Sequence, residues 1–162
     1  MRSPSATLAA ATALALAVSG CGGPDLNLGS GGDLKVPDGS YEEVAGAICE
    51  QIGARFADAQ RDEPRTFSQG AAVTANLLDI ARDGEEALAN IEPPGDVAAA
   101  YRRYLSSRGD VVAHLQRANA AAEDEDGAAY EDARREAESG AGKRAKLARQ
   151  AGLPRCAAVE ER

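Results

Sequence analysis

Aromatic and metal-binding side chains are scarce in this chain of 162 residues, which has no Trp, two Phe, one His and one Met. A single His and a single Met leave too few ligands for a typical transition-metal site, so we expect no metal centre and no cofactor. Basic residues are the minority, with 18 Lys and Arg against 26 Asp and Glu and a net charge of −8. Nucleic-acid-binding proteins carry a basic footprint, so we expect no nucleic-acid partner. The length indicates one domain and is short for a two-domain solute receptor.

Large apolar side chains are also few. From Tyr41 to Arg162, Leu, Ile, Val and Phe contribute 19 of 122 residues, a fraction that is typical of disordered chains when the net charge is high. The net charge over this span is only −7, from 16 basic and 23 acidic residues. Ala, the best helix former, supplies much of the remainder. The composition therefore predicts an Ala-rich helical domain with a thin core.

The N-terminal residues have the pattern of a secretory signal peptide. Arg2 precedes an apolar run of about 11 residues from Leu8 to Val18, which small residues follow. Such a run is too short to span a membrane as a helix. We therefore interpret residues 1–20 as a signal peptide.

The segment Leu16-Ala-Val-Ser-Gly-Cys21 resembles the lipobox of bacterial lipoproteins. In that family an aliphatic residue and two small ones precede an invariant Cys, which receives a diacylglyceryl thioether before cleavage. The resemblance implies lipidation at Cys21 and a mature protein on the outer face of the bacterial cytoplasmic membrane, or on a periplasm-facing leaflet. At least two acyl chains would anchor it firmly, because one chain binds only marginally. The alternative is an ordinary signal peptide cut near Gly20, with Cys21 free or paired.

A linker separates this segment from the rest of the chain. Residues 22–39 contain six Gly and two Pro and show no helical period, which is typical of a tether. Such a coil spans about 20–25 Å on average. We therefore divide the chain into a signal peptide (1–20), a lipidated Cys with a Gly-rich linker (21–39) and a helical bundle domain (40–162).

The domain is expected to be all-α, because apolar residues recur every three or four positions and no segment alternates with period two. Short connections favour antiparallel neighbours, so we predict a four-helix up-down antiparallel bundle. Its helices are expected between residues 41 and 60, 67 and 91, 97 and 122, and 128 and 151.

Start signals precede three of these helices. Ser40 with Glu43, and Thr66 with Gln69, have the spacing of capping boxes, and Asp96 is a candidate cap for the third helix.

The fourth helix carries an interruption and a stop signal. Gly140 and Gly142 each cost about 1 kcal/mol relative to Ala, so a bend or fraying is expected there. Gly152 suits the left-handed position after the last turn, and Pro154 prevents continuation.

Cys49 and Cys156 are the remaining cysteines. Outside the cytoplasm an even pair predicts a disulfide, and in an up-down bundle the fourth helix ends beside the start of the first. Closing a 107-residue loop is worth about 4–5 kcal/mol in the chain-entropy account. The alternative, a redox or metal pair, lacks CxxC spacing and a neighbouring His.

The third helix holds the candidate ligand groove. Tyr101 and Tyr104 are three residues apart and either line a groove or lie in the core. Asp110 and His114 share a face, where they either orient a ligand or metal or form a surface pair. Signatures of nucleophilic catalysis and of phosphate loops are missing, so we expect no catalytic residues and no enzyme activity.

Charged clusters occur at both ends of the fourth helix. The acidic run at residues 123–126 either attracts Ca²⁺, without EF-hand spacing, or forms a solvated turn. Five cations at the far end either complement the helix dipole or rest on anionic lipid. These are Lys143, Arg144, Lys146, Arg149 and Arg155.

Outside residues 8–21 the resemblance is one of composition, to small Ala-rich surface lipoproteins of high-GC bacteria, most without an assigned function. It implies a membrane partner through the lipid anchor. We expect a non-enzymatic, lipid-anchored bundle that binds a partner, such as an envelope protein, or supports the envelope. The alternative is a small-molecule or metal-binding sensor.

Overall fold

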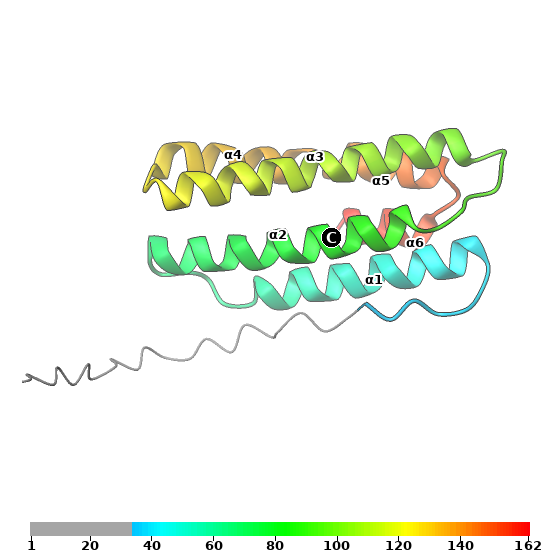
Figure 1. Ribbon diagram of the computed structural model, residues 1–162, viewed down its shortest axis with the longest axis horizontal. Helices are drawn as coiled ribbons and strands as arrows, with labels where there is room; N and C mark the ends of the chain where they lie inside the picture. The colour runs from blue at the N-terminus through cyan, green and yellow to red at the C-terminus, as the bar shows by residue number, and fades with distance from the viewer. Residues whose placement is uncertain (1–33) are drawn as a thin grey trace, which may run out of the picture.

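The computed structural model describes residues 34–162, which form helices joined by turns and loops, with no strand in this range (Figure 1). The predicted all-α fold is therefore confirmed. The predicted signal peptide, Cys21 and most of the linker lie outside the described residues. Within the described range there are six helices: α1 (Tyr41–Ala59), α2 (Phe67–Ala89), α3 (Ala98–Glu123), α4 (Gly127–Ser139), α5 (Ala141–Gln150) and α6 (Pro154–Glu160).

Side-chain caps start α1 and α2 where the sequence predicts them. Ser40 and Glu43 form the complete capping box, with each side chain bonded to the backbone N–H of the other. Thr66 accepts the N–H of Gln69. The prediction that Asp96 caps the third helix is wrong. The N-cap of α3 is Val97, which has no side-chain cap, because the turn after the two prolines delays the helix start by one residue.

The predicted fourth helix is two helices, α4 and α5, which Gly140 separates. Gly140 has φ −86° and ψ −1°, so the α-helical hydrogen-bond ladder is interrupted at one of the two glycines where a bend is expected. In Figure 1, α4 and α5 follow one another along α3.

The end of α5 has the geometry that its glycine predicts. Gly152 has φ +74°, its N–H donates to Arg149 O, and the N–H of Leu153 donates to Ala148 O at 2.9 Å. These two bonds are those of a Schellman motif. Pro154 then begins α6, which the sequence analysis missed. Proline is tolerated there because the first residue of a helix needs no intrahelical N–H bond.

The packing differs between the two ends of the domain. The last helix, α6, contacts both α1 and α5 and lies between them (Figure 1). At the other end, α4 packs against α3 and has no comparable contact with α1 or α2. The end that contains α6 is therefore closed, and the end that contains α4 is more open.

Small residues allow the helices to approach closely. Gly84 on α2 faces Ile52 on α1, and a Cβ atom added at Gly84 would lie 2.4 Å from Ile52 Cδ1 and 2.9 Å from its Cγ1. Ile52 is 1% exposed and packed on all sides, so it has little freedom to move away. Glycine at position 84 therefore sets the distance between α1 and α2.

We expect Gly84→Ala to lower the free energy of unfolding by about 1–3 kcal/mol, the usual effect of overpacking a core. Urea denaturation followed by circular dichroism measures this difference. Gly142→Ala is the matched control, because no atom lies within 4 Å of a Cβ there, and we expect it to cause no loss. Equal destabilisation by both substitutions would contradict the close-contact explanation.

Candidate functional site

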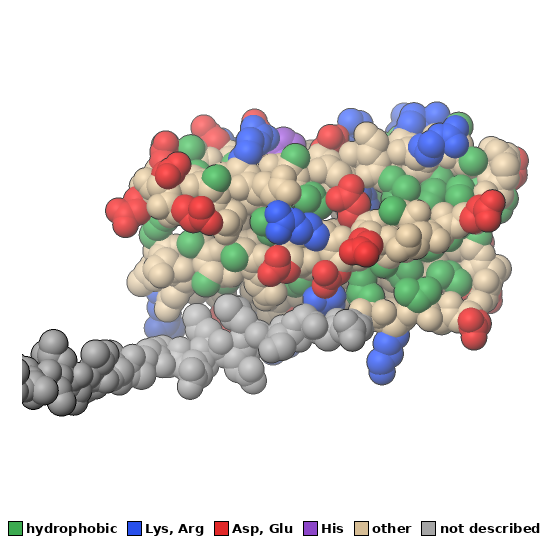
Figure 2. Space-filling view, in the orientation of Figure 1, with side chains coloured by type: hydrophobic (Ala, Val, Ile, Leu, Met, Phe, Trp, Pro, Cys, Tyr) green, Lys and Arg blue, Asp and Glu red, His purple; other side chains and the backbone are tan. Residues whose placement is uncertain are grey.

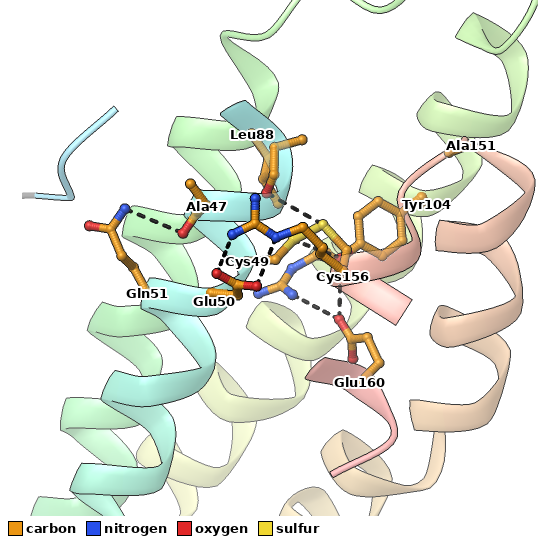
Figure 3. The surroundings of a disulfide bond; sticks show 12 residues. Ala47, Cys49, Glu50, Gln51, Leu88, Tyr104, Ala151, Cys156 and Glu160 are labelled. Atoms are coloured by element: carbon orange, nitrogen blue, oxygen red, sulfur yellow. Dashed lines mark hydrogen bonds and ion pairs between the residues drawn. A yellow bond between two sulfur atoms is a disulfide. The ribbon is translucent and has the colours of Figure 1, made fainter. Parts of the chain in front are cut away.

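A disulfide joins Cys49 on α1 to Cys156 on α6, with a Cα–Cα distance of 5.1 Å (Figure 3). This is the pairing that the sequence predicts. Both cysteines are 0% exposed. The bond therefore lies inside the domain and links the first helix to the last.

Glu160 on α6 lies between two arginines close to the disulfide. Arg108 Nη1 donates to Glu160 Oε1 at 2.8 Å, and Arg144 Nε donates to Oε2 at 2.6 Å. The three side chains are only 7–11% exposed. Glu160 thereby neutralises one of two buried positive charges that α3 and α5 supply.

Tyr104 connects this ion cluster to the disulfide. Its hydroxyl donates to Glu160 Oε1 at 3.4 Å and lies 3.6 Å from Cys49 Sγ, as Figure 3 shows. Burial raises the pKa of the Tyr104 hydroxyl. Burial alone would lower the pKa of Arg108, but the neighbouring Tyr104 and Glu160 outweigh it and the pKa is raised. Arg108 therefore stays charged at neutral pH despite its burial.

The two tyrosines of the candidate groove are core residues. Tyr101 is 1% exposed and Tyr104 is 0% exposed. The Tyr101 hydroxyl donates to Leu88 O at 2.6 Å, and its ring meets Tyr41 edge-on with 5.4 Å between the centroids. The predicted ligand groove at these tyrosines is therefore wrong, and their alternative interpretation as core residues describes them. Their face of α3 is buried against α1, α2 and α6.

Asp110 and His114 form no hydrogen bond with one another in the described part of the chain. The His114 Nδ1 lies 3.1 Å from Glu136 Oε2 on α4, and Arg117 pairs with the same carboxylate at 2.6 Å. Asp110 is exposed and makes no ion pair within the described range. Among residues 34–162, no group of three or more His, Cys, Asp or Glu side chains is placed to share a metal ion.

The five cations near the end of α5 do not form one exposed surface. Arg144 is buried against Glu160. Arg149 pairs with Glu161 at 2.6 Å. Arg155 Nε donates to Glu50 Oε1 at 2.8 Å. Lys143 and Lys146 are exposed and form no ion pair in the described part of the chain. On the face in Figure 2, basic and acidic side chains are interspersed. The expected basic cluster is therefore largely neutralised by acidic residues of the same chain.

The acidic run forms a tight turn between α3 and α4. Glu125 adopts φ +55°, and Asp126 caps α4 by accepting the Ala129 N–H at 3.0 Å. The carboxylate of Asp126 is thus used in the local structure, as its interpretation as a turn implies.

A groove of about 530 Å³ lies between the start of α2 and α4. We call it the α2–α4 groove. It is at the end of the domain where α4 packs mainly on α3. Its walls include aromatic, basic and acidic side chains, among them Arg65, Phe67, Tyr130, Arg134, Arg135 and Glu138.

Buried hydrogen bonds hold the floor of the α2–α4 groove. Thr74 is 0% exposed, and its Oγ1 lies 2.8 Å from the Tyr130 hydroxyl. Arg134 Nη1 donates to the same Oγ1 at 3.2 Å, and its Nη2 pairs with Glu138 at 3.3 Å. Gly70 leaves room for the tyrosine, because a Cβ there would be only 3.1 Å from the Tyr130 hydroxyl oxygen. The buried Thr74 and Tyr130 therefore hold the Arg134 guanidinium in position.

The rim carries an exposed aromatic ring and further arginines. Phe67 is 41% exposed, one of two exposed large hydrophobic residues in the described range, and its ring meets Tyr130 at 5.2 Å. Arg65 is exposed and forms no ion pair within residues 34–162. Arg135 pairs only with Asp132, on the same helix.

The sequence pattern did not predict this groove. The available signal was the position of Phe67 immediately after the N-cap, where a side chain faces the loop as well as the core. Nothing in the sequence placed Tyr130 beside it.

No protein-family model, curated protein or solved structure matches this chain. None of the helices within residues 34–162 is long and apolar enough to cross a membrane.

Proposed function

We propose that this chain is a lipid-anchored, extracytoplasmic helical protein of a bacterial envelope with a non-enzymatic binding or structural role. The observation that carries the proposal is the lipobox-like segment that ends in Cys21. The Cys49–Cys156 disulfide supports it independently, because such bonds persist in oxidising compartments and are rare in the cytosol. The proposed location is the outer face of the cytoplasmic membrane or a periplasm-facing leaflet.

The first described residues are held against α1, so an anchor at Cys21 would lie close to the domain. The N–H of Lys35 donates to Gln51 Oε1 at 3.0 Å, and Gln51 Nε2 donates to Lys35 O at 2.8 Å. These bonds fasten the chain beside the middle of α1. The 13 Cα–Cα steps from Cys21 to Leu34 span at most about 45 Å, so the domain would remain near the bilayer.

The surroundings of the single histidine support a binding or structural role over acyl-transfer catalysis. His114 contacts Glu136 and Arg117, and no Ser or Cys side chain hydrogen-bonds to it within the described residues. A histidine general base needs a nucleophile within hydrogen-bond reach.

The finer arrangement of the helices belongs to the same proposal. We interpret α1, α2, α3 and the broken pair α4–α5 as an up-down bundle. Packing of consecutive helices supports this interpretation, as does α6, which contacts both α5 and α1.

Lipidation is tested by the intact mass of the full chain extracted from bacterial membranes. We expect the wild-type protein to carry a diacylglyceryl mass and Cys21→Ser to lose it, because only a thiol can form the thioether. The Cys49→Ser/Cys156→Ser double variant is the control and should retain the acyl mass. A wild-type chain without acyl groups, or a label that survives Cys21→Ser, would refute the anchor.

Small-molecule binding is the second candidate function, and the α2–α4 groove favours it. Its volume of about 530 Å³ lies in the range of about 300–1,000 Å³ that is usual for ligand sites. In this second candidate the ligand site is the α2–α4 groove, at the opposite end of the domain from Tyr101 and Tyr104, where the sequence predicted it.

A further inference from the structure

We propose that the α2–α4 groove binds an organic carboxylate: one carboxylate group attached to a flat apolar body such as an aromatic ring. This inference rests on the binding role proposed above and names the class of ligand. It does not depend on the lipid anchor.

Arg134 is the residue that the carboxylate would meet. Its guanidinium presents five N–H donors in a planar fork that matches a carboxylate. Thr74 takes one donor from below, and Glu138, which is 67% exposed, takes another from the side. Arg134 lines the groove, and its other three donors have no hydrogen-bond partner within the described residues. Because Thr74 is buried and bonded to Tyr130, Arg134 is held in place before a ligand arrives, which reduces the entropy lost on binding.

The apolar body would lie against Phe67. A single exposed hydrophobic side chain is common on protein surfaces. Phe67, however, lines a groove, and its ring is oriented by an edge-to-face contact with the buried Tyr130. Aromatic rings and arginine planes both favour contact with flat ligands. An apolar surface and a braced guanidinium thus occur side by side.

The charges in the groove favour one negative group over several. Three arginines and two glutamates line it, which gives a local charge of +1 in a chain whose net charge is −8. The second arginine, Arg65, comes from the opposite wall and has no ion-pair partner within the described range. Glu131 and Glu138 would repel a second carboxylate.

The fold explains why the groove is open. Contacts of α6 with α1 and α5 fill the corresponding gap at the disulfide end, but α6 has only seven residues and does not reach α4. At the groove end, contacts of Thr74 and Phe67 with Tyr130 join α2 to α4 at the base and rim of the groove, and the loop before Phe67 forms one wall.

The test is a binding measurement on the full chain in a non-ionic detergent, with benzoate, acetate and benzyl alcohol as probes. Ligand-observed NMR and calorimetry give the dissociation constants. We expect benzoate to bind at least about tenfold more tightly than acetate, which lacks the ring, and than benzyl alcohol, which lacks the charge.

Substitutions locate the site. We expect Arg134→Gln to raise the dissociation constant of benzoate about tenfold, as loss of a charge-assisted hydrogen bond does, and Phe67→Ala to raise it several-fold. Arg82→Gln is the matched control, because this exposed arginine of α2 does not line the groove, and it should change nothing. Thermal melts establish that each variant is folded. If Arg134→Gln does not fold, Arg65→Gln and Phe67→Ala decide.

The proposal is overturned if benzoate binds no better than the other two probes, or if folded groove variants bind it like the wild type. The acyl mass at Cys21 is measured separately. A chain without acyl groups that still binds benzoate would refute the anchor alone. A lipidated chain that does not bind benzoate would refute the ligand class alone.

Discussion

Cys49→Ser is expected to lower the free energy of unfolding by about 4–5 kcal/mol. The disulfide closes a loop of 107 residues, and without it the unfolded chain regains the entropy that this loop removes. Domains of this size have a total stability of about 5–15 kcal/mol, so the loss is a large part of it. The thin, Ala-rich core leaves little to compensate. Urea denaturation and thermal melts under non-reducing conditions measure the effect.

Two controls separate the bond from the hydroxyl that serine introduces. Cys49→Ala carries no hydroxyl and should lose the same stability, because Cys49 is fully buried and the main change is the broken bond. Reduction of the unfolded wild-type chain, followed by refolding with a reductant, should bring its melt to that of the variants. A melt that is identical with and without the disulfide would contradict this prediction.

Glu160→Gln is expected to lower the free energy of unfolding by about 3–5 kcal/mol, the usual effect of removing one partner from a buried ion pair. The carboxylate is the acceptor for both Arg108 and Arg144, so its loss leaves two buried guanidinium groups without a counter-charge. Glutamine preserves the volume, which limits the change to charge. Chemical denaturation of the two proteins side by side gives the difference.

Glu161→Gln is the neighbouring control. Its pair with Arg149 is about half exposed on both sides, and such surface pairs contribute about 0–1 kcal/mol. A loss at Glu160 as small as that at Glu161 would show that the cluster is solvated. Replacement of Arg108, Arg144 and Glu160 together by Met, Met and Leu should be close to neutral, because whole buried ion clusters often add little net stability.

Both the disulfide and Glu160 fasten α6 to the rest of the domain, one to α1 and the other to α3 and α5. The double variant is therefore expected to lose less free energy of unfolding than the sum of the two single losses, because either change alone already loosens α6.

Several parts of the structure could be predicted because they depend on near neighbours in the chain. The cap at Ser40, the turn at Gly152 and the break at Gly140 are each decided within one helical turn. Asp96 was assigned wrongly because a competing turn, begun by the two preceding prolines, displaced the helix start. The cysteine pairing was predictable from the count of cysteines together with the antiparallel course expected of short-looped helices.

The candidate sites were predictable only in part. Helical spacing showed that Tyr101 and Tyr104 share a face, but spacing is the same for a face that lines a groove and for one that is buried. The cations near Arg149 looked like one surface because their partners Glu50, Glu160 and Glu161 are far from them in sequence or lie on an unpredicted helix. The α2–α4 groove was missed because Phe67 and Tyr130 are 63 positions apart.

The sequence by itself determined the helical class, most helix starts and stops, the cysteine pairing and the expectation of a lipid anchor. All of these follow from short-range rules: caps, glycine and proline geometry, and composition. Tertiary structure alone decided which tyrosines are buried, which arginines are neutralised and where a groove remains. These outcomes depend on α6, which packs between α1 and α5 at one end, and on α4, which at the other end packs mainly on α3 and meets α2 around Tyr130. Contacts between helices so distant in sequence are set by how whole surfaces pack, which no local pattern encodes.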